Sequence, residues 1–168
     1  SSGYERKRVA SEASRVRQHL VLSNSVLDLE PTQPTERKAM SHPLTAASTL
    51  LVLLFYLVVT MNVGRARGKY GIKAPAVSGN EHFERAYRVQ MNSLEHIAFL
   101  LPAMWLYALT LSDLGACIGG VVWVLGRIIY ALAYVKNPSS RGTGMMISFL
   151  AQIGLFLGAV YGVIKAML

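Results

Sequence analysis

Four long apolar stretches restrict the fold of this chain more than any other feature. They occupy residues 44–63, 86–111, 116–135 and 145–168. The first holds 20 residues without a charged side chain, and a helix of that length spans about 30 Å, the thickness of a hydrocarbon core. The chain is 52% hydrophobic and 15% charged, whereas a soluble domain is about 25% charged. We predict an all-α integral membrane protein, a bundle of four transmembrane helices.

Polar connections separate the stretches and predict their arrangement. They comprise residues 64–85, 112–115 and 136–144. The last two are short, so neighbouring helices should be antiparallel. Residues 64–88 hold six basic and two acidic side chains, whereas residues 112–115 hold only one charge, an acidic one. Because cytoplasmic loops are enriched in lysine and arginine, we expect the first and third connections to face the cytoplasm.

The net charge of +8 indicates the kind of partner. Many of the basic side chains border the apolar stretches, which favours a membrane surface or an anionic ligand over nucleic acid. The chain has one cysteine, so it has no internal disulfide and no cysteine zinc site. Its four histidines lack metal-ligand spacing, and we expect no metal.

Residues 1–39 are predicted to be a separate N-terminal extension, disordered or non-native. They begin with Ser1 rather than methionine, and a linker-like run follows at residues 31–35. They lack the apolar core of a signal peptide. We expect the functional membrane domain to be residues 40–168, preceded by upstream translation, expression sequence or a tail.

Polar side chains form a narrow stripe on the second apolar stretch. The stripe consists of Arg85, Arg88, Asn92 and Glu95, which lie within about 80° of one another on a helix. Ionisable groups inside a membrane span are costly and usually mark a site. The alternative is a helix end that emerges into water, which suits Arg85 best. Gln90 and His96 lie off the centre of the stripe, and His96 is either a site residue or a packed one.

A second stripe follows on the third stretch, where Arg127, Tyr130 and Tyr134 share one face. The tyrosines could instead belong to an interfacial aromatic belt. Arg127 lies too deep to reach the surface easily, and Glu95 is the only acid inside the spans, so we expect the two to pair. The stripes and Arg141 carry a surplus of arginine, and arginine binds carboxylates with two hydrogen bonds. They predict an anion site at the cytoplasmic end of the bundle.

The fourth stretch contains Gly154, Gly158 and Gly162 at intervals of four residues. We interpret them as a small-residue face for close helix packing. The alternative is that glycine is simply common in membrane helices.

The polar stripes resemble two signatures of the MAPEG family, the membrane-associated proteins of eicosanoid and glutathione metabolism. Residues 83–95 (FERAYRVQMNSLE) look like its second-helix signature. Residues 126–130 (GRIIY), followed by Tyr134 and Arg141-Gly142, look like its third-helix signature. The loop at residues 64–71 is similar to the bacterial branch, which favours a bacterial inner membrane over an endoplasmic reticulum. The resemblance covers residues 44–165.

The resemblance implies a homotrimer with glutathione in a cleft between neighbouring protomers. Carried over by position, the glutathione-binding residues would be Arg88, Asn92, Glu95, Tyr130 and Tyr134, with Gln90 or Arg67 reaching in from the adjacent protomer. Arg141 would lie at the sulfur as the catalytic residue. Arg127 would be a structural anchor between helices, for Glu95 or a neighbour.

Two positions depart from the family pattern. His96 stands where some relatives have a tyrosine that touches glutathione. Ala98 replaces a common proline, and Pro102 follows four residues later, so the kink of the second helix should lie one turn further on.

The implied activity is that of a glutathione transferase for detoxification. Arg141 would stabilise the thiolate, which attacks lipophilic electrophiles from the bilayer or, as a peroxidase, lipid hydroperoxides. One alternative is a non-enzymatic lipid-binding or lipid-presenting member of the family. Another is a small membrane transport or scaffold subunit, which would not bind glutathione. The glutathione motif is shared by relatives with different electrophiles, so it does not select one.

Overall fold

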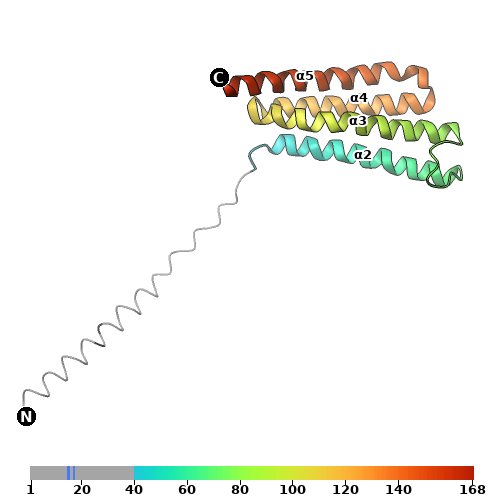
Figure 1. Cartoon of the computed structure of the whole chain (residues 1–168), viewed down its shortest axis with the longest axis horizontal. Coiled ribbons are helices and arrows are strands. Elements are labelled where there is room, and N and C mark those ends of the chain that lie inside the picture. Colours follow the sequence, from blue (N-terminus) through green and yellow to red (C-terminus); the bar gives the residue numbers. More distant parts are fainter. Residues whose placement is uncertain (1–14, 16, 18–39) are drawn as a thin grey trace, which may run out of the picture. The chain divides into compact units, whose positions relative to one another are not determined.

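Four long helices lie side by side and alternate in direction (Figure 1). They belong to a computed structural model that describes residues 15, 17 and 40–168. The helices are α2 (Pro43–Lys69), α3 (Glu81–Thr110), α4 (Asp113–Lys136) and α5 (Gly142–Met167), and a short 3-10 helix, η1 (Pro138–Arg141), joins the last two. Each long helix is apolar and long enough to cross a membrane. The predicted all-α, antiparallel bundle of four membrane-spanning helices is confirmed.

The predicted N-terminal extension lies outside the described residues, apart from positions 15 and 17. Residues 40–168 form one compact unit.

The helices α3 and α4 form the centre of the bundle. Each packs against the other and against both α2 and α5. Trp123 of α4 and Leu100 and Met104 of α3 are fully buried between them, and Phe55 of α2 meets the Trp123 ring edge to face with centroids 6.1 Å apart. The loops at residues 70–80 and 137–141 lie at the same end of this core (Figure 1).

All four helices begin before their apolar stretches, and the differences are largest for α2 and α3. The helix α2 continues six residues past position 63, and α3 begins five residues before position 86. Asn80 explains the earlier start, because its side chain accepts hydrogen bonds from the backbone amides of His82 and Phe83 and so caps α3. Pro102 lies inside α3, which continues to Thr110.

The start of α2 is capped by a residue from another helix. The Oδ1 atom of Asp113, at the start of α4, accepts from the Thr45 amide at 2.9 Å and from the Thr45 hydroxyl at 2.6 Å. Its Oδ2 atom accepts from the Leu44 amide at 3.1 Å. These bonds satisfy amide groups that a helix leaves free at its first turn and join α2 to α4 at the end opposite the two loops.

The predicted glycine face of α5 is confirmed at two of its three positions. A Cβ atom on Gly158 would overlap the Tyr107 ring of α3, and one on Gly162 would overlap Thr110. The prediction was wrong for Gly154, where a Cβ atom would meet nothing within 4 Å. Residues four apart advance about 40° around a helix, so Gly154 has already turned away from α3.

A second close contact, between α4 and α5, was not anticipated. A Cβ atom on Gly126 would lie 2.6 Å from the backbone nitrogen of Ser148, and one on Gly144 would overlap the backbone nitrogen of Tyr130. Backbone atoms cannot rotate away as side chains do. The two glycines therefore set the distance between the helices next to Tyr130.

Candidate functional site

A buried arginine joins α4 to α3 at the centre of the two predicted polar stripes. Arg127 is fully buried, and both of its terminal nitrogens donate to Oδ1 of Asn92 at 3.0 Å. One of them also donates to the hydroxyl of Ser93 at 2.8 Å. Hydrogen bonds from a charged group are about twice as strong as neutral ones, so these contacts hold the two helices in one register.

The pairing of Arg127 with Glu95 was wrong, whereas the other expectation, an anchor to a neighbour of Glu95, agrees with the contacts to Asn92 and Ser93. Glu95 is exposed, and its carboxylate accepts from Nδ2 of Asn92 at 3.3 Å. A search for an opposite charge ignores neutral hydrogen-bond acceptors. Asn92 and Ser93 are such acceptors, and they lie further around α3 towards α4. Asn92 therefore lies between the two charges, with its oxygen on the guanidinium and its nitrogen on the carboxylate.

This arrangement leaves Glu95 available to a ligand. The Asn92 oxygen is engaged by Arg127, which orients the amide and directs its nitrogen to Glu95. An exposed carboxylate that is oriented by a neighbouring amide can accept hydrogen bonds from an ammonium group.

The second stripe forms a column in which two stacked rings lie between two cations. The guanidinium carbon of Arg127 lies 4.2 Å from the centroid of the Tyr130 ring. Tyr130 stacks on Tyr134 with centroids 5.5 Å apart, and the guanidinium carbon of Arg141 lies 5.7 Å from the Tyr134 centroid. Cations within about 6 Å of a ring centroid are attracted by its quadrupole. Only 3% of Tyr130 is exposed, so the alternative of an interfacial aromatic does not describe it.

A cleft of about 390 Å³ lies beside this column, between the start of α3 and the end of α4. Arg88 and Tyr134 both line it, together with Glu84 and Arg85. The structure therefore brings Arg88 of the first stripe to Tyr134 of the second. It joins the polar ends of the two helices into one surface.

Arg85 has a structural role that its position on the polar stripe does not reveal. It donates to the backbone oxygens of Val135 and Lys136, at 3.2 Å each, and pairs with Glu81 one turn earlier. It thus caps the last turn of α4. Its position on the polar stripe was visible in the sequence, but its long-range partners were not.

Three other predicted residues have partners away from the column. Nδ1 of His96 lies 2.8 Å from Oε1 of Gln152 in α5. This contact is the one expected of a residue packed between helices. Gln90 donates to the Thr60 hydroxyl of α2 at 3.2 Å. Arg67 donates to the backbone oxygens of Ile72 and Ala76 at 3.3 and 2.9 Å, and so folds the loop that follows α2.

The charges of this surface suit an extended anion that also carries an ammonium group. Arg88 and Arg141 are exposed cations that both lie near Tyr134, and Glu95 is an exposed carboxylate held by Asn92. Among residues 40–168, no three His, Cys, Asp or Glu side chains are grouped closely enough to hold a metal ion.

The sequence is similar to one known protein family and to several of its members. The sequence model of the MAPEG family matches residues 45–161. An uncharacterized protein from Synechocystis is 45% identical over 119 residues, which is 71% of this chain and 87% of the relative. Human microsomal glutathione S-transferase 2 is 33% identical over 119 residues, 70% of this chain and 80% of the relative. Leukotriene C4 synthase from Cavia porcellus is 30% identical over 98 residues, 58% of this chain and 65% of the relative.

Proposed function

The chain belongs to the MAPEG family of integral membrane proteins, and we propose that it is a glutathione transferase. In this role it stabilises the glutathione thiolate and conjugates it to lipophilic electrophiles. The observation that carries the proposal is the chain of contacts from buried Arg127 through Asn92 to exposed Glu95, next to the Tyr130–Tyr134–Arg141 column. The similarity to microsomal glutathione S-transferase 2 supports it.

Glutathione matches the charges of this surface. It has two carboxylates, one ammonium group and a thiol. Arg88 binds a carboxylate and Glu95 binds the ammonium, with Asn92 orienting Glu95. Tyr130 and Tyr134 supply ring contacts, and Arg141 lies at the sulfur.

The chemistry follows from the charge of Arg141. A free thiol has a pKa of about 8.5 and reacts as its thiolate. Arginine stays protonated, so Arg141 acts electrostatically and the thiol proton leaves to water. Lowering the thiol pKa by about two units corresponds to about 2.7 kcal/mol. The thiolate sulfur then bonds to an electrophilic carbon. In a substitution the electron pair departs with the leaving group, and in an addition it takes a proton from water to form a C–H bond.

The same thiolate also suits reduction of a lipid hydroperoxide. It attacks one oxygen, the O–O bond breaks and the lipid alcohol is released. The resulting sulfenic acid reacts with a second glutathione to give the disulfide and water.

The proposed assembly is a homotrimer in a bacterial inner membrane, with the glutathione sites facing the cytoplasm. The lysines and arginines gathered at the end of the two loops support this orientation. In the proposed trimer, Gln90 or Arg67 of one protomer reaches the glutathione of its neighbour. His96 follows Glu95 on α3, and we propose that it also contacts glutathione while its Nδ1 atom stays next to Gln152.

The alternative within the family is a non-enzymatic lipid-binding protein. Turnover distinguishes the two. We expect the solubilised full chain to conjugate glutathione to chlorodinitrobenzene. The variant Arg141→Ala should lose at least about 100-fold in kcat/KM, because removal of one electrostatic donor typically lowers the rate by that factor. Lys73→Ala removes a cation from the neighbouring loop and should leave the rate unchanged. A wild-type protein that binds glutathione but never turns over would favour the lipid-binding alternative.

A further inference from the structure

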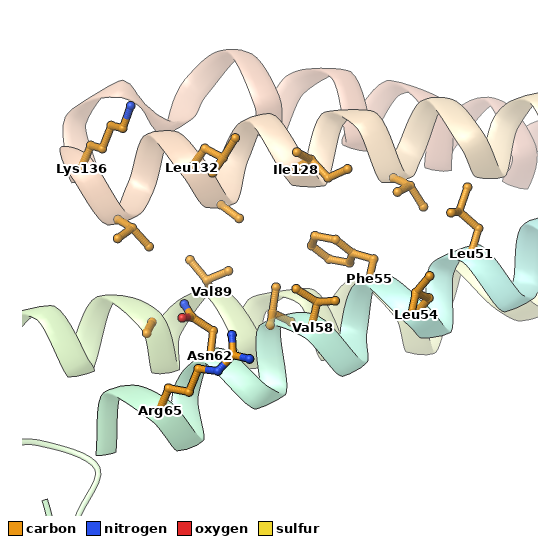
Figure 2. A pocket seen from close by; sticks show the side chains of 15 residues that line it. Leu51, Leu54, Phe55, Val58, Asn62, Arg65, Val89, Ile128, Leu132 and Lys136 are labelled. Atoms are coloured by element: carbon orange, nitrogen blue, oxygen red, sulfur yellow. The ribbon is translucent and has the colours of Figure 1, made fainter. Parts of the chain in front are cut away.

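A groove on the outside of the bundle lies between α2 and α4 and has α3 as its floor (Figure 2). Its volume is about 500 Å³. Ala86 and Val89 of α3 line it, on the other side of that helix from Arg88 and Glu95. None of the residues assigned to glutathione lines this groove, so it is separate from the candidate site.

The walls of the groove are aliphatic over most of their length. They include Leu51, Leu54 and Val58 from α2 and Ile128 and Leu132 from α4. Leu54 is 56% exposed and Leu132 is 62% exposed, so more than half of each residue remains free to contact a ligand. Such walls suit a hydrocarbon chain.

The polar residues of the groove gather at one end. Asn62 and Arg65 line this end from α2 and Lys136 lines it from α4, across the groove from them, and the Lys136 amine points away from Arg65 in Figure 2. No acidic side chain lines the groove, and neither cation has an ion-pair partner within residues 40–168. The groove thus combines an apolar body with a cationic mouth.

The length of the groove matches one leaflet of a bilayer. At about 1.5 Å per residue, α2 runs about 21 Å from Leu51 to Arg65, and α4 runs about 18 Å from Val124 to Lys136. Half of a bilayer with its headgroup region is about 20–22 Å thick. The mouth therefore lies at headgroup depth when the apolar end reaches the midplane.

The volume favours a single acyl chain over a helix of a second copy. A helix about 10–12 Å across and 21 Å long occupies about 2,000 Å³, which is about four times the volume of the groove. A helix of a second copy would therefore lie mostly outside the groove, whereas a single hydrocarbon chain can lie within it.

We propose that the groove holds one acyl chain of an anionic phospholipid, whose phosphate lies at the end that Arg65 and Lys136 line and binds Arg65 first. Arginine binds phosphate oxygens through two parallel hydrogen bonds, and lysine adds a point charge. Basic pockets between membrane helices are known to hold anionic headgroups. The bound lipid would contact both α2 and α4.

Native mass spectrometry of the full chain, without glutathione, tests the charge requirement. The probes are phosphatidylglycerol and phosphatidylcholine with identical acyl chains. We expect one tightly bound phosphatidylglycerol per chain and weaker binding of phosphatidylcholine. A cation near the membrane surface contributes about fivefold to affinity, so Arg65→Gln with Lys136→Gln should weaken phosphatidylglycerol binding about 25-fold. Lys73→Gln removes a charge from the nearby loop and should change it less than twofold.

A second pair of variants tests the apolar body. Val58→Trp places a large ring in the groove, whereas Leu57→Trp places it on the same helix outside the lining. Both positions are more than half exposed, so neither disturbs the core. We expect Val58→Trp to remove the tightly bound lipid and Leu57→Trp to retain it, with both variants keeping the wild-type oligomeric state.

Several outcomes would overturn the proposal. One is unchanged phosphatidylglycerol affinity in the variant without the two cations, and another is equal binding of phosphatidylcholine. Displacement of phosphatidylglycerol by equimolar palmitate would assign the groove to a fatty acid. Disulfide formation between copies carrying Val58→Cys, in a Cys117→Ser background, would assign it to a second copy of the chain.

Discussion

Arg127 and Asn92 form the central polar contact of the bundle, since both terminal nitrogens of the arginine donate to one amide oxygen at 3.0 Å. The arginine is fully buried, and a buried charge is tolerated only when it is hydrogen-bonded. The same asparagine orients Glu95 at the surface. One amide thus connects the stability of the helix pair to the proposed glutathione site.

Asn92→Ala should lower the free energy of unfolding by about 3 kcal/mol, because it leaves most of the Arg127 donors without an acceptor. Denaturant titration of the solubilised protein measures the change. Asn92→Asp is the matched control, since it retains an acceptor oxygen and should recover most of the stability. Equal loss in both variants would mean that the contact with Arg127 is not what matters at this position.

Glu95→Gln should weaken glutathione binding about tenfold and leave the unfolding free energy unchanged. The side chain is exposed and can still accept from Asn92 as an amide, but it loses the charge that binds the ammonium. Isothermal titration calorimetry measures the affinity. Glu84→Gln, at the cleft but off the proposed contact, should bind glutathione within about twofold of wild type. Wild-type affinity in Glu95→Gln would exclude the proposed role of Glu95.

Gly144→Ala should destabilise the protein by about 1–3 kcal/mol, the usual range for overpacking. Its Cβ atom would overlap the backbone of Tyr130 and push α4 and α5 apart. Gly154→Ala is the control on the same helix. Its Cβ atom meets nothing, and alanine favours a helix by up to about 1 kcal/mol over glycine. Thermal unfolding of the two variants should therefore shift in opposite directions, and a shared direction would contradict the close contact.

Asp113→Ala should lower the free energy of unfolding by about 1–2 kcal/mol, as loss of a helix cap does. The variant frees the amides of Leu44 and Thr45 at the start of α2. Asp113→Asn retains one acceptor oxygen and should lose less. Because this cap lies at the end of the bundle away from the two loops, glutathione affinity should stay unchanged in both variants. A large loss of affinity would show that the two ends are coupled.

The helices and the two stripes could be predicted because they depend on local patterns. Apolar length identifies a membrane helix, and the 100° periodicity placed Arg127 and Tyr130 on one face, as the column shows. Helix ends were less predictable where a helix continues past its apolar stretch, as α2 does to Lys69.

Contacts between residues far apart in the chain could not be predicted from the sequence. Ser93 as an acceptor for Arg127, Arg85 as a cap for α4 and Asp113 as a cap for α2 depend on how the helices pack. Their residue types allow many partners, so spacing does not select one. The same reason explains the wrong partner for Arg127, since a rule of opposite charges favours Glu95 over a neutral amide.

The most direct measurement of the central claim is the ultraviolet absorbance of the glutathione thiolate on mixing with the solubilised protein near neutral pH. We predict a signal that saturates with glutathione, is lost in Arg141→Ala and persists in Lys73→Ala. Absence of the signal in the wild type, with the assembly intact and glutathione bound, would contradict the stabilisation of a thiolate at Arg141.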